Sequence, residues 1–309
     1  MTPQSLRDYG LVLTLSLIWG SSFLLVKIAV ADVPPLTMAA SRVAIAFAVL
    51  YAVARWRGQS LTAPRSEGGA SIWGHFLVIG MLGNGIPFTL ISWGEIEVSS
   101  ALAAILIGVM PVFTMVFAHG FGVERLTGGK RIIGIIAGFA GLVVLIGPTA
   151  LLQLGHATMH EFGIIAAAAS YAATGVYARR LSLRMSAVVL SAGAMAASSV
   201  VMVPAALILE TPWRLSPGLG PLLAVVTLGI AATGLASIVY FRLLALAGPT
   251  FASTINYLIP VFGAVLGVIL LGETLGTSDL VALALILSGI ALVRNPMARG
   301  PATGPDARD

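Results

Sequence analysis

The segment IPVFGAVLGVILLGETL at residues 259–275 repeats an earlier one, MPVFTMVFAHGFGVERL at residues 110–126. Six of the seventeen aligned positions are identical, including Pro-Val-Phe near the start and Glu-x-Leu at the end. A run of apolar residues separates these two motifs in both copies. The chain therefore contains a duplicated unit, and the places where the two copies fall determine which fold the sequence predicts.

The composition indicates a protein surrounded by lipid rather than by water. Hydrophobic residues make up 58% of the 309 residues and charged residues only 9%, whereas a soluble domain carries about 25% charged residues. Too few charges remain to cover the surface of a soluble protein of this size. The 35 glycines suit close packing of membrane helices. We therefore expect a polytopic membrane protein whose surroundings are the lipid bilayer.

Ten apolar segments are each long enough to cross a membrane as a helix, which takes about 20 residues. They cover residues 9–30, 35–54, 72–93, 97–119, 130–147, 161–179, 186–208, 219–244, 250–271 and 279–294. Their length and lack of alternation argue against the short alternating strands of a membrane barrel. We expect the first segment to remain in the mature protein as a span, although it imitates a signal peptide.

When the ten predicted spans are placed across a membrane, nearly all loop Lys and Arg residues fall on one face. Thirteen of the 17 fall at the termini or in even-numbered loops, which share one face, and the opposite face holds only Arg214. The remaining three, Lys27, Arg42 and Arg242, lie inside spans or at their ends. Because positively charged loops stay on the cytoplasmic side, we predict an inner-membrane protein with both termini in the cytoplasm.

The two copies of the Pro-Val-Phe motif lie five spans apart. Pro111 falls in span four and Pro260 in span nine. Because five is an odd number, two copies of a five-helix unit must face opposite ways in the membrane. We predict an all-α polytopic membrane protein of ten transmembrane helices, with a first repeat at residues 1–150, an inverted second repeat at 151–296 and a disordered cytoplasmic tail at 297–309.

A second, weaker alignment pairs WGSSFLLVK at residues 19–27 with YAATGVYAR at residues 171–179. Inverted repeats can exchange conformations around a site near the middle of the membrane, which then opens to one side and next to the other. This arrangement favours a transporter that works by alternating access. A duplicated scaffold, such as a channel or an assembly subunit, remains an alternative.

Several function classes lack their sequence signals. The chain has no G-x-x-x-x-G-K-[ST] motif, which excludes ATP-driven transport by this chain alone, and no ATPase partner is implied. It has no cysteine and only four scattered histidines, so we predict no metal site and no cofactor. The basic residues are too scattered for nucleic-acid binding, and clustered His or acidic residues that a membrane enzyme would need are absent from the sequence.

Three parts of the chain resemble the drug/metabolite transporter superfamily, within its EamA family. They are WGSSFLLVKIAV and the following PP at residues 19–35, Arg42, and the stretch 230–293 with its P-V-F, LGE-x-L and G-I-x-L motifs. The similarity covers residues 5–295, and the first half departs from the pattern, with GVERL in place of LGE-x-L. The resemblance implies ten helices in two inverted repeats and the export of amino acids and metabolites across the bacterial inner membrane.

Aromatic and polar side chains at mid-span positions are the candidates for a solute site. They are Trp19, Ser22, Asn84, Tyr171, Thr174, Tyr240, Asn256 and Tyr257. Asn84 lies between two glycines and near Pro87, and a weakened helix is tolerated in a membrane where it lines a cavity. Two alternatives stay open, because Ser and Thr commonly bond the preceding turn of their own helix and Trp and Tyr commonly mark the membrane interface.

Three charged residues near the spans receive separate predictions. Arg42 lies about two turns into span two, where it is either a counter-charge for a solute carboxylate or a side chain that snorkels to the interface. The resemblance implies that an arginine at this position is a family feature. Glu95 and Glu97 flank a short external loop, and we expect both to be exposed to water.

The repeated motif contributes matched prolines and acidic residues. Pro111 and Pro260 each remove a backbone hydrogen bond, so we expect them to kink spans four and nine and to act as hinges. Glu124 and Glu273 close their helices, and we predict that each holds the following loop through nearby backbone donors.

No Asp or Glu falls in the middle of a predicted span, whereas ion-coupled carriers usually bind the ion at such a carboxylate. We therefore predict facilitative or exchange-type export of an aromatic or other apolar or neutral amino acid, or of a related small metabolite. Alternatives are an importer, a carrier of sugars or phosphorylated metabolites, and a membrane scaffold. A phosphate carrier would need several basic residues at mid-depth, where only Arg42 occurs.

Overall fold

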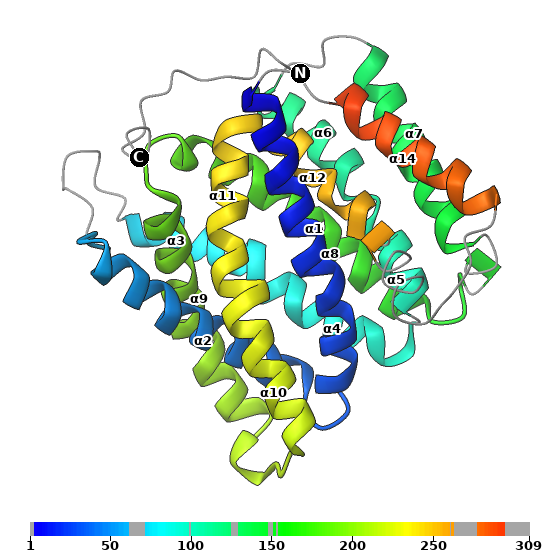
Figure 1. The fold of residues 1–309 in the computed structure, drawn as a ribbon. Helices are drawn as coiled ribbons and strands as arrows, with labels where there is room; N and C mark the ends of the chain where they lie inside the picture. Colours follow the sequence, from blue (N-terminus) through cyan, green and yellow to red (C-terminus); the bar gives the residue numbers. More distant parts are fainter. Residues whose placement is uncertain are drawn as a thin grey trace.

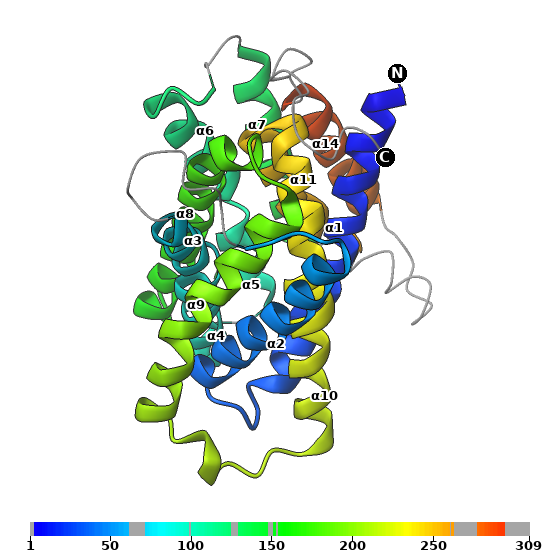
Figure 2. The same ribbon diagram turned by 90° about the vertical axis from the view of Figure 1, so that its left-hand side faces the viewer.

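The computed structural model describes residues 3–61, 72–98, 100–124, 129–147, 151–152, 154–259, 261–262 and 277–293. These residues form a bundle of helices and include no strand (Figure 1). The first helix begins and the last described helix ends at the same end of the bundle. The connection around residues 210–218 forms the opposite end (Figure 2).

The described helices follow one another along both halves of the chain. The first half contains α1 (Pro3–Ala29), α2 (Pro35–Trp56), α3 (Ile72–Gly80), η1 (Met81–Gly85), α4 (Ile86–Glu97), α5 (Ser100–Ile107), α6 (Met110–Gly120) and α7 (Gly129–Ile146). The second half contains α8 (Thr158–Ser182), α9 (Ala187–Leu209), η3 (Pro212–Arg214), α10 (Leu219–Thr227), η4 (Leu228–Leu235), α11 (Ala236–Ala247), α12 (Pro249–Ser253) and α14 (Thr277–Val293).

Five helical segments in the described part of the chain are long and apolar enough to cross a membrane. They are Leu6–Ala29, Pro35–Trp56, Ile72–Glu97, Ala187–Leu209 and Leu219–Ala247, and two shorter apolar helices lie at Ile105–Gly120 and Leu280–Val293. The predicted class of all-helical membrane protein is confirmed. The count of ten spans and the inversion of the two halves stay predictions, and the span expected at 250–271 lies partly outside the described residues.

Two of the long segments change from α-helix to π-helix near their middle. In Ile72–Glu97 the π-helical part is η1, with the sequence MLGNG, and in Leu219–Ala247 it is η4, with the sequence LGIAATGL. Glycine lowers helix stability, which suits both sequences to a change of helix type. Single π-helical turns are frequent at functional sites, and each of these two segments has buried residues facing the interior of the bundle.

Pro111 begins a helix rather than kinking one. The predicted span at 97–119 is divided into α5 and α6, and Pro111 occupies the first turn of α6. Proline is tolerated there because the backbone N–H groups of the first turn have no partner within the helix. Across the break, backbone hydrogen bonds join residues three apart, as in a 3₁₀-helix. They run from Val109 N to Leu106 O at 3.4 Å and from Val112 N to Val109 O at 3.0 Å. Pro260 lies outside the described residues.

Helices α7 and α14 pack along each other through glycines. A Cβ atom added to Gly289 would lie 2.5 Å from the carbonyl oxygen of Gly134, and one added to Gly134 would lie 2.7 Å from that of Gly289. No side chain fits between backbones this close. This contact is an example of the close helix packing that the glycine content indicates.

Helices α4 and α8 also approach closely, at the end of α4. A Cβ on Gly94 would lie 2.5 Å from Cγ1 of Ile164, and a Cβ on Gly163 would lie 2.9 Å from the Trp93 ring. This contact presses the last turns of α4 into the bundle. It determines the surroundings of Glu95, the residue that follows Gly94.

Candidate functional site

A cavity of about 140 Å³ lies in the middle of the bundle. It is similar in size to an engineered protein cavity of about 150 Å³ that admits benzene. Its wall comes from both halves of the chain: α1, α2, α3, η1, α4 and α6 from the first, and α8, α9, η4, α11, α12 and the residues after α12 from the second. The wall includes both π-helical turns, through Asn84 of η1 and Thr233 of η4.

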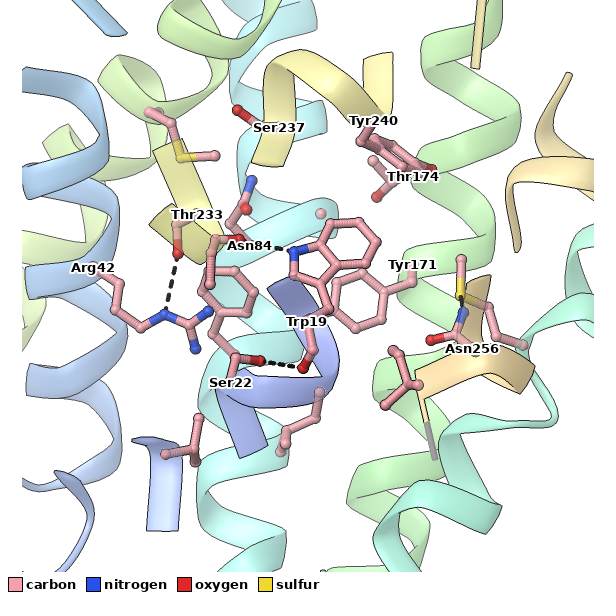
Figure 3. Close-up of a pocket in the computed structure, with 18 of the residues that line it drawn as sticks. Trp19, Ser22, Arg42, Asn84, Tyr171, Thr174, Thr233, Ser237, Tyr240 and Asn256 are labelled. Atoms are coloured by element: carbon pink, nitrogen blue, oxygen red, sulfur yellow. Dashed lines mark hydrogen bonds between the residues drawn. The ribbon is translucent and has the colours of Figure 1, made fainter. Parts of the chain in front are cut away.

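Seven of the eight candidate solute-site residues line this cavity, together with Arg42. The seven are Trp19, Ser22, Asn84, Tyr171, Thr174, Tyr240 and Asn256. Figure 3 places Arg42 on one side of the cavity, Tyr171 and Asn256 on the other, and Trp19 between them. Residues far apart in the sequence thus converge on one site.

Tyr257 is the candidate that does not line the cavity. Its side chain is 0% exposed, and its hydroxyl donates to the carbonyl oxygen of Ile135 at 3.1 Å. The ring lies against Gly138, where an added Cβ would come within 2.5 Å of it. Tyr257 therefore packs the chain after α12 against α7, and its placement at the cavity is corrected.

Aromatic rings form much of the cavity wall. The Trp19 indole donates from Nε1 to the carbonyl oxygen of Ala232, in the π-helical turn η4, at 2.8 Å. Its ring lies 5.7 Å, centroid to centroid, from the ring of Tyr240. Because the indole N–H is bonded and the ring is packed on one side, Trp19 presents a fixed aromatic surface to the cavity.

Two of the lining hydroxyls are bonded within their own helices. Ser22 donates to the carbonyl oxygen of Trp19 at 2.7 Å, and Thr174 donates to that of Ser170 at 3.0 Å. These bonds match the alternative that the sequence left open for Ser and Thr. Both oxygens can still accept a hydrogen bond from a bound molecule, but their protons are engaged.

The two asparagines that line the cavity have more free hydrogen-bonding groups than these hydroxyls. Asn256 donates from Nδ2 to the carbonyl oxygen of Ser253 and to the sulfur of Met110, both at 3.0 Å, which leaves its amide oxygen as an acceptor. Asn84 is 9% exposed and makes no side-chain hydrogen bond within the part of the chain that the structure describes. The cavity therefore offers a few fixed polar groups among apolar and aromatic ones.

Arg42 is a buried cation on the cavity wall. Its side chain is 6% exposed, its Nε donates to Oγ1 of Thr233 at 3.2 Å, and its guanidinium carbon lies 3.9 Å from the centre of the Phe88 ring. The hydroxyl and the ring fix the guanidinium in place. Arg42 is buried and faces the cavity, which favours the counter-charge interpretation over snorkelling.

Glu95 also lies on the cavity wall, and the prediction that water surrounds it is wrong. Helix α4 continues to Glu97, past the predicted end of the span at residue 93, and the Glu95 side chain is 0% exposed. Neither of its carboxylate oxygens has a hydrogen-bond partner. Glu97 is exposed, as expected.

A helical pattern in the sequence identifies the face on which Glu95 lies. Glu95 follows Ser92, Ile91, Phe88 and Asn84 by three, four, seven and eleven residues, and all five line the cavity. Positions three or four apart share one face of a helix. Extending the helix of span three to this glutamate would therefore have placed it on the same face as Asn84, about three turns further along.

Glu124 lies away from the cavity, at the end of the bundle where α1 begins. Its Oε2 accepts a hydrogen bond from Nη2 of Arg131 at 2.9 Å, and the two side chains are 9% and 7% exposed. Arg131 also donates from Nε to the carbonyl oxygen of Val293, at the end of α14, at 3.4 Å. Glu124 thus contacts a side chain where backbone donors were expected, and Glu273 lies outside the described residues.

A helical membrane bundle around a cavity with aromatic, amide and charged groups is the architecture of a transporter for small molecules. Sequence comparison agrees: the profile of the EamA-like transporter family matches residues 7–147 and 158–295. The chain belongs to this family, and the resemblance predicted from the sequence is confirmed. The protein is therefore a membrane transporter related to transporters of metabolites.

Individual relatives match along nearly the whole chain. The inner membrane transporter YedA of Escherichia coli (strain K12) is 31% identical over 296 residues, which cover 94% of this chain and 91% of YedA. A Salmonella typhimurium protein named "Probable amino-acid metabolite efflux pump" is 27% identical over an alignment that covers 93% of this chain and 94% of that protein. A crystal structure at 22% identity superposes with a TM-score of 0.72 over 93% of this chain and 96% of that one, which supports the fold alone.

Proposed function

We propose that the protein exports amino acids with aromatic or other apolar, neutral side chains, or closely related metabolites, across the inner membrane by alternating access. The observation that carries the proposal is the cavity wall, where the buried cation Arg42 lies within one small space with the rings of Trp19, Tyr171 and Tyr240 (Figure 3).

The chemistry of this wall suits a molecule with a charged head and an apolar body. The planar guanidinium of Arg42 is matched in shape to a carboxylate, and the aromatic rings provide an apolar surface for a side chain. Most hydroxyl groups along the rest of the wall donate to backbone carbonyl oxygens nearby in the chain, so few of their protons are free for a solute. A site of this kind rejects analogues weakly, because a change in an apolar side chain leaves few buried polar groups unpaired. We therefore propose broad specificity.

Two features support alternating access by inverted repeats at residues 1–150 and 151–296. The π-helical turns η1 and η4 occur in predicted spans three and eight, five spans apart, and both contribute to the cavity wall. The family profile matches two stretches of the chain, 7–147 and 158–295, which correspond to the proposed repeats. In transporters of inverted repeats, interrupted helices commonly surround the solute site.

The name of the Salmonella relative supports both the solute class and the direction of transport. Cytoplasmic termini remain part of the proposal, based on the separation of the Lys and Arg residues. A carrier of phosphorylated metabolites fits the cavity less well, because Arg42 is the only basic side chain among the described residues that line it.

The test is efflux from liposomes that contain the purified protein and are loaded with a mixture of amino acids and metabolites. We expect apolar and aromatic amino acids to leave faster than from empty liposomes. Trp19→Ala and Asn256→Ala should slow efflux at least about tenfold, since each removes a group fixed in the wall. Trp213→Ala is the matched control, because Trp213 is 66% exposed at the end of the bundle. Normal efflux by both cavity variants would contradict the proposed site.

A further inference from the structure

The carboxyl group of Glu95 lies in the cavity wall without a partner. Its side chain is 0% exposed, and neither carboxylate oxygen accepts a hydrogen bond. A buried carboxylate without donors is strongly unfavourable as an anion. Such a group becomes stable either by taking up a proton or by binding a cation at its oxygens.

The charged and titratable groups around Glu95 leave its carboxylate unpaired. From α1, Nζ of Lys27 donates to the backbone oxygen of Glu95 at 3.3 Å. Arg42 from α2 and Tyr171 from α8 also line the cavity. From α8, the ring of His160 lies 4.3 Å, centroid to centroid, from the ring of Trp93 on α4. Helix α5 carries no titratable residue. In the part of the chain that the structure describes, neither cation forms an ion pair with the carboxylate.

We infer that Glu95 binds the ammonium group of the solute and a proton in turn, so that transport exchanges one proton for one solute molecule. This inference rests on the proposed function and names its coupling. Arg42 and Glu95 give the cavity one positive and one negative group, held apart on α2 and α4. An α-amino acid carries the complementary pair of charges, with its carboxylate for Arg42 and its ammonium group for Glu95.

The exchange follows from competition at one carboxylate. When the cavity opens outward, the ammonium group leaves Glu95, and a proton from external water binds the same carboxylate. When the cavity opens inward, that proton passes to cytoplasmic water, and the next ammonium group takes its place. Each cycle moves one solute molecule out and one proton in, and a zwitterionic solute makes the cycle carry one net positive charge inward. The sequence argument against a buried coupling carboxylate no longer holds.

The first experiment measures proton movement in liposomes that contain the wild-type protein and a trapped pH-sensitive dye. With L-phenylalanine inside, efflux should acidify the interior, and an inward proton gradient should accelerate efflux. Phenylalanine efflux without any pH change would overturn the exchange and leave the proposed function standing. Efflux of neither phenylalanine nor the metabolite mixture would overturn the proposed function and the inference with it.

The second experiment measures binding to detergent-purified protein with 2-phenylethylamine, which has the ammonium group and lacks the carboxylate. Competition with one proton should weaken its apparent affinity about tenfold for each pH unit of acidification, below the pH at which Glu95 loses its proton. In Glu95→Gln the affinity should be independent of pH and at least about tenfold weaker at high pH, because a charge-assisted bond is lost. Affinity for 3-phenylpropionate, which lacks the ammonium group, should not fall in this variant.

Glu97→Gln is the matched control, since Glu97 lies two residues further along the same helix and is exposed. It should retain both the proton movement and the pH dependence. If Glu95→Gln does not fold, the proton movement and the pH dependence of binding measured with the wild type test the inference without it. Binding of 2-phenylethylamine by the wild type that does not change with pH would overturn the inference.

Discussion

Replacing Arg42 by methionine should separate recognition of the solute carboxylate from recognition of the rest of the molecule. In the proposed complex the guanidinium donates charge-assisted hydrogen bonds to that carboxylate. Such a bond contributes about 1.5–3 kcal/mol, and each 1.4 kcal/mol is about tenfold in affinity. Arg42→Met should therefore weaken binding of L-phenylalanine by about 10- to 150-fold. Binding of 2-phenylethylamine, which has no carboxylate, should be unchanged or stronger.

The fold should tolerate this substitution. Arg42→Met loses the 3.2 Å bond to Thr233 and the 3.9 Å contact with the Phe88 ring. It also removes a buried charge, and replacing a buried charged group by an apolar one of similar volume is often neutral for stability. A thermal unfolding curve in detergent, close to that of the wild type, would show that any loss of binding is local.

The assay is isothermal titration of both ligands against wild type, Arg42→Met and the control Arg242→Met, whose arginine is exposed on α11. The control should bind both ligands as the wild type does. Equal weakening of both ligands by Arg42→Met would refute the assignment of Arg42 to the carboxylate, and so would unchanged binding of phenylalanine.

Three further substitutions test how the bundle is held together. Glu124→Gln should lower the free energy of unfolding by about 3–5 kcal/mol, because it breaks a buried ion pair with Arg131. Gly289→Val should lower it by about 1–3 kcal/mol, since a Cβ would lie 2.5 Å from the Gly134 oxygen. Gly94→Val should push α4 away from α8, because the new Cβ would lie 2.5 Å from Cγ1 of Ile164 on α8. It should slow transport and lower the melting temperature.

Thermal unfolding followed by circular dichroism measures all three changes, and liposome efflux measures the last. Gly10→Ala is the control for the glycine variants, because nothing lies within 4 Å of a Cβ at that position. A double variant, Glu124→Gln with Arg131→Gln, should recover part of the stability lost by the single one. A melting temperature unchanged by Glu124→Gln would contradict the role given to this ion pair.

The sequence predicted the helices well, because apolar runs of membrane length leave little choice of secondary structure. The predicted span at 35–54 became Pro35–Trp56 and that at 186–208 became Ala187–Leu209. The division of the span at 97–119 was not predicted. Proline is compatible with a kink inside a helix and with the first turn of a new one, and the sequence around Pro111 does not distinguish the two.

The direction of single side chains was harder to predict than the helix that carries them. Asn256 and Tyr257 are neighbours in sequence, so their side chains point in different directions, and only Asn256 reaches the cavity. Glu95 was misplaced because the first acidic residues after an apolar run mark the usual end of a span. Its burial comes from Gly94 fitting against Ile164 of α8, a long-range contact that the sequence does not specify.

The central claim is that the cavity opens to each side of the membrane in turn, and one thiol can test it. The natural chain has no cysteine, so Ser237→Cys places a single reactive group on the cavity wall. A membrane-impermeant maleimide should label it in both right-side-out and inside-out vesicles, and L-phenylalanine should slow labelling from either side. Labelling from one side alone under all conditions, with no protection by the solute, would contradict alternating access at this cavity.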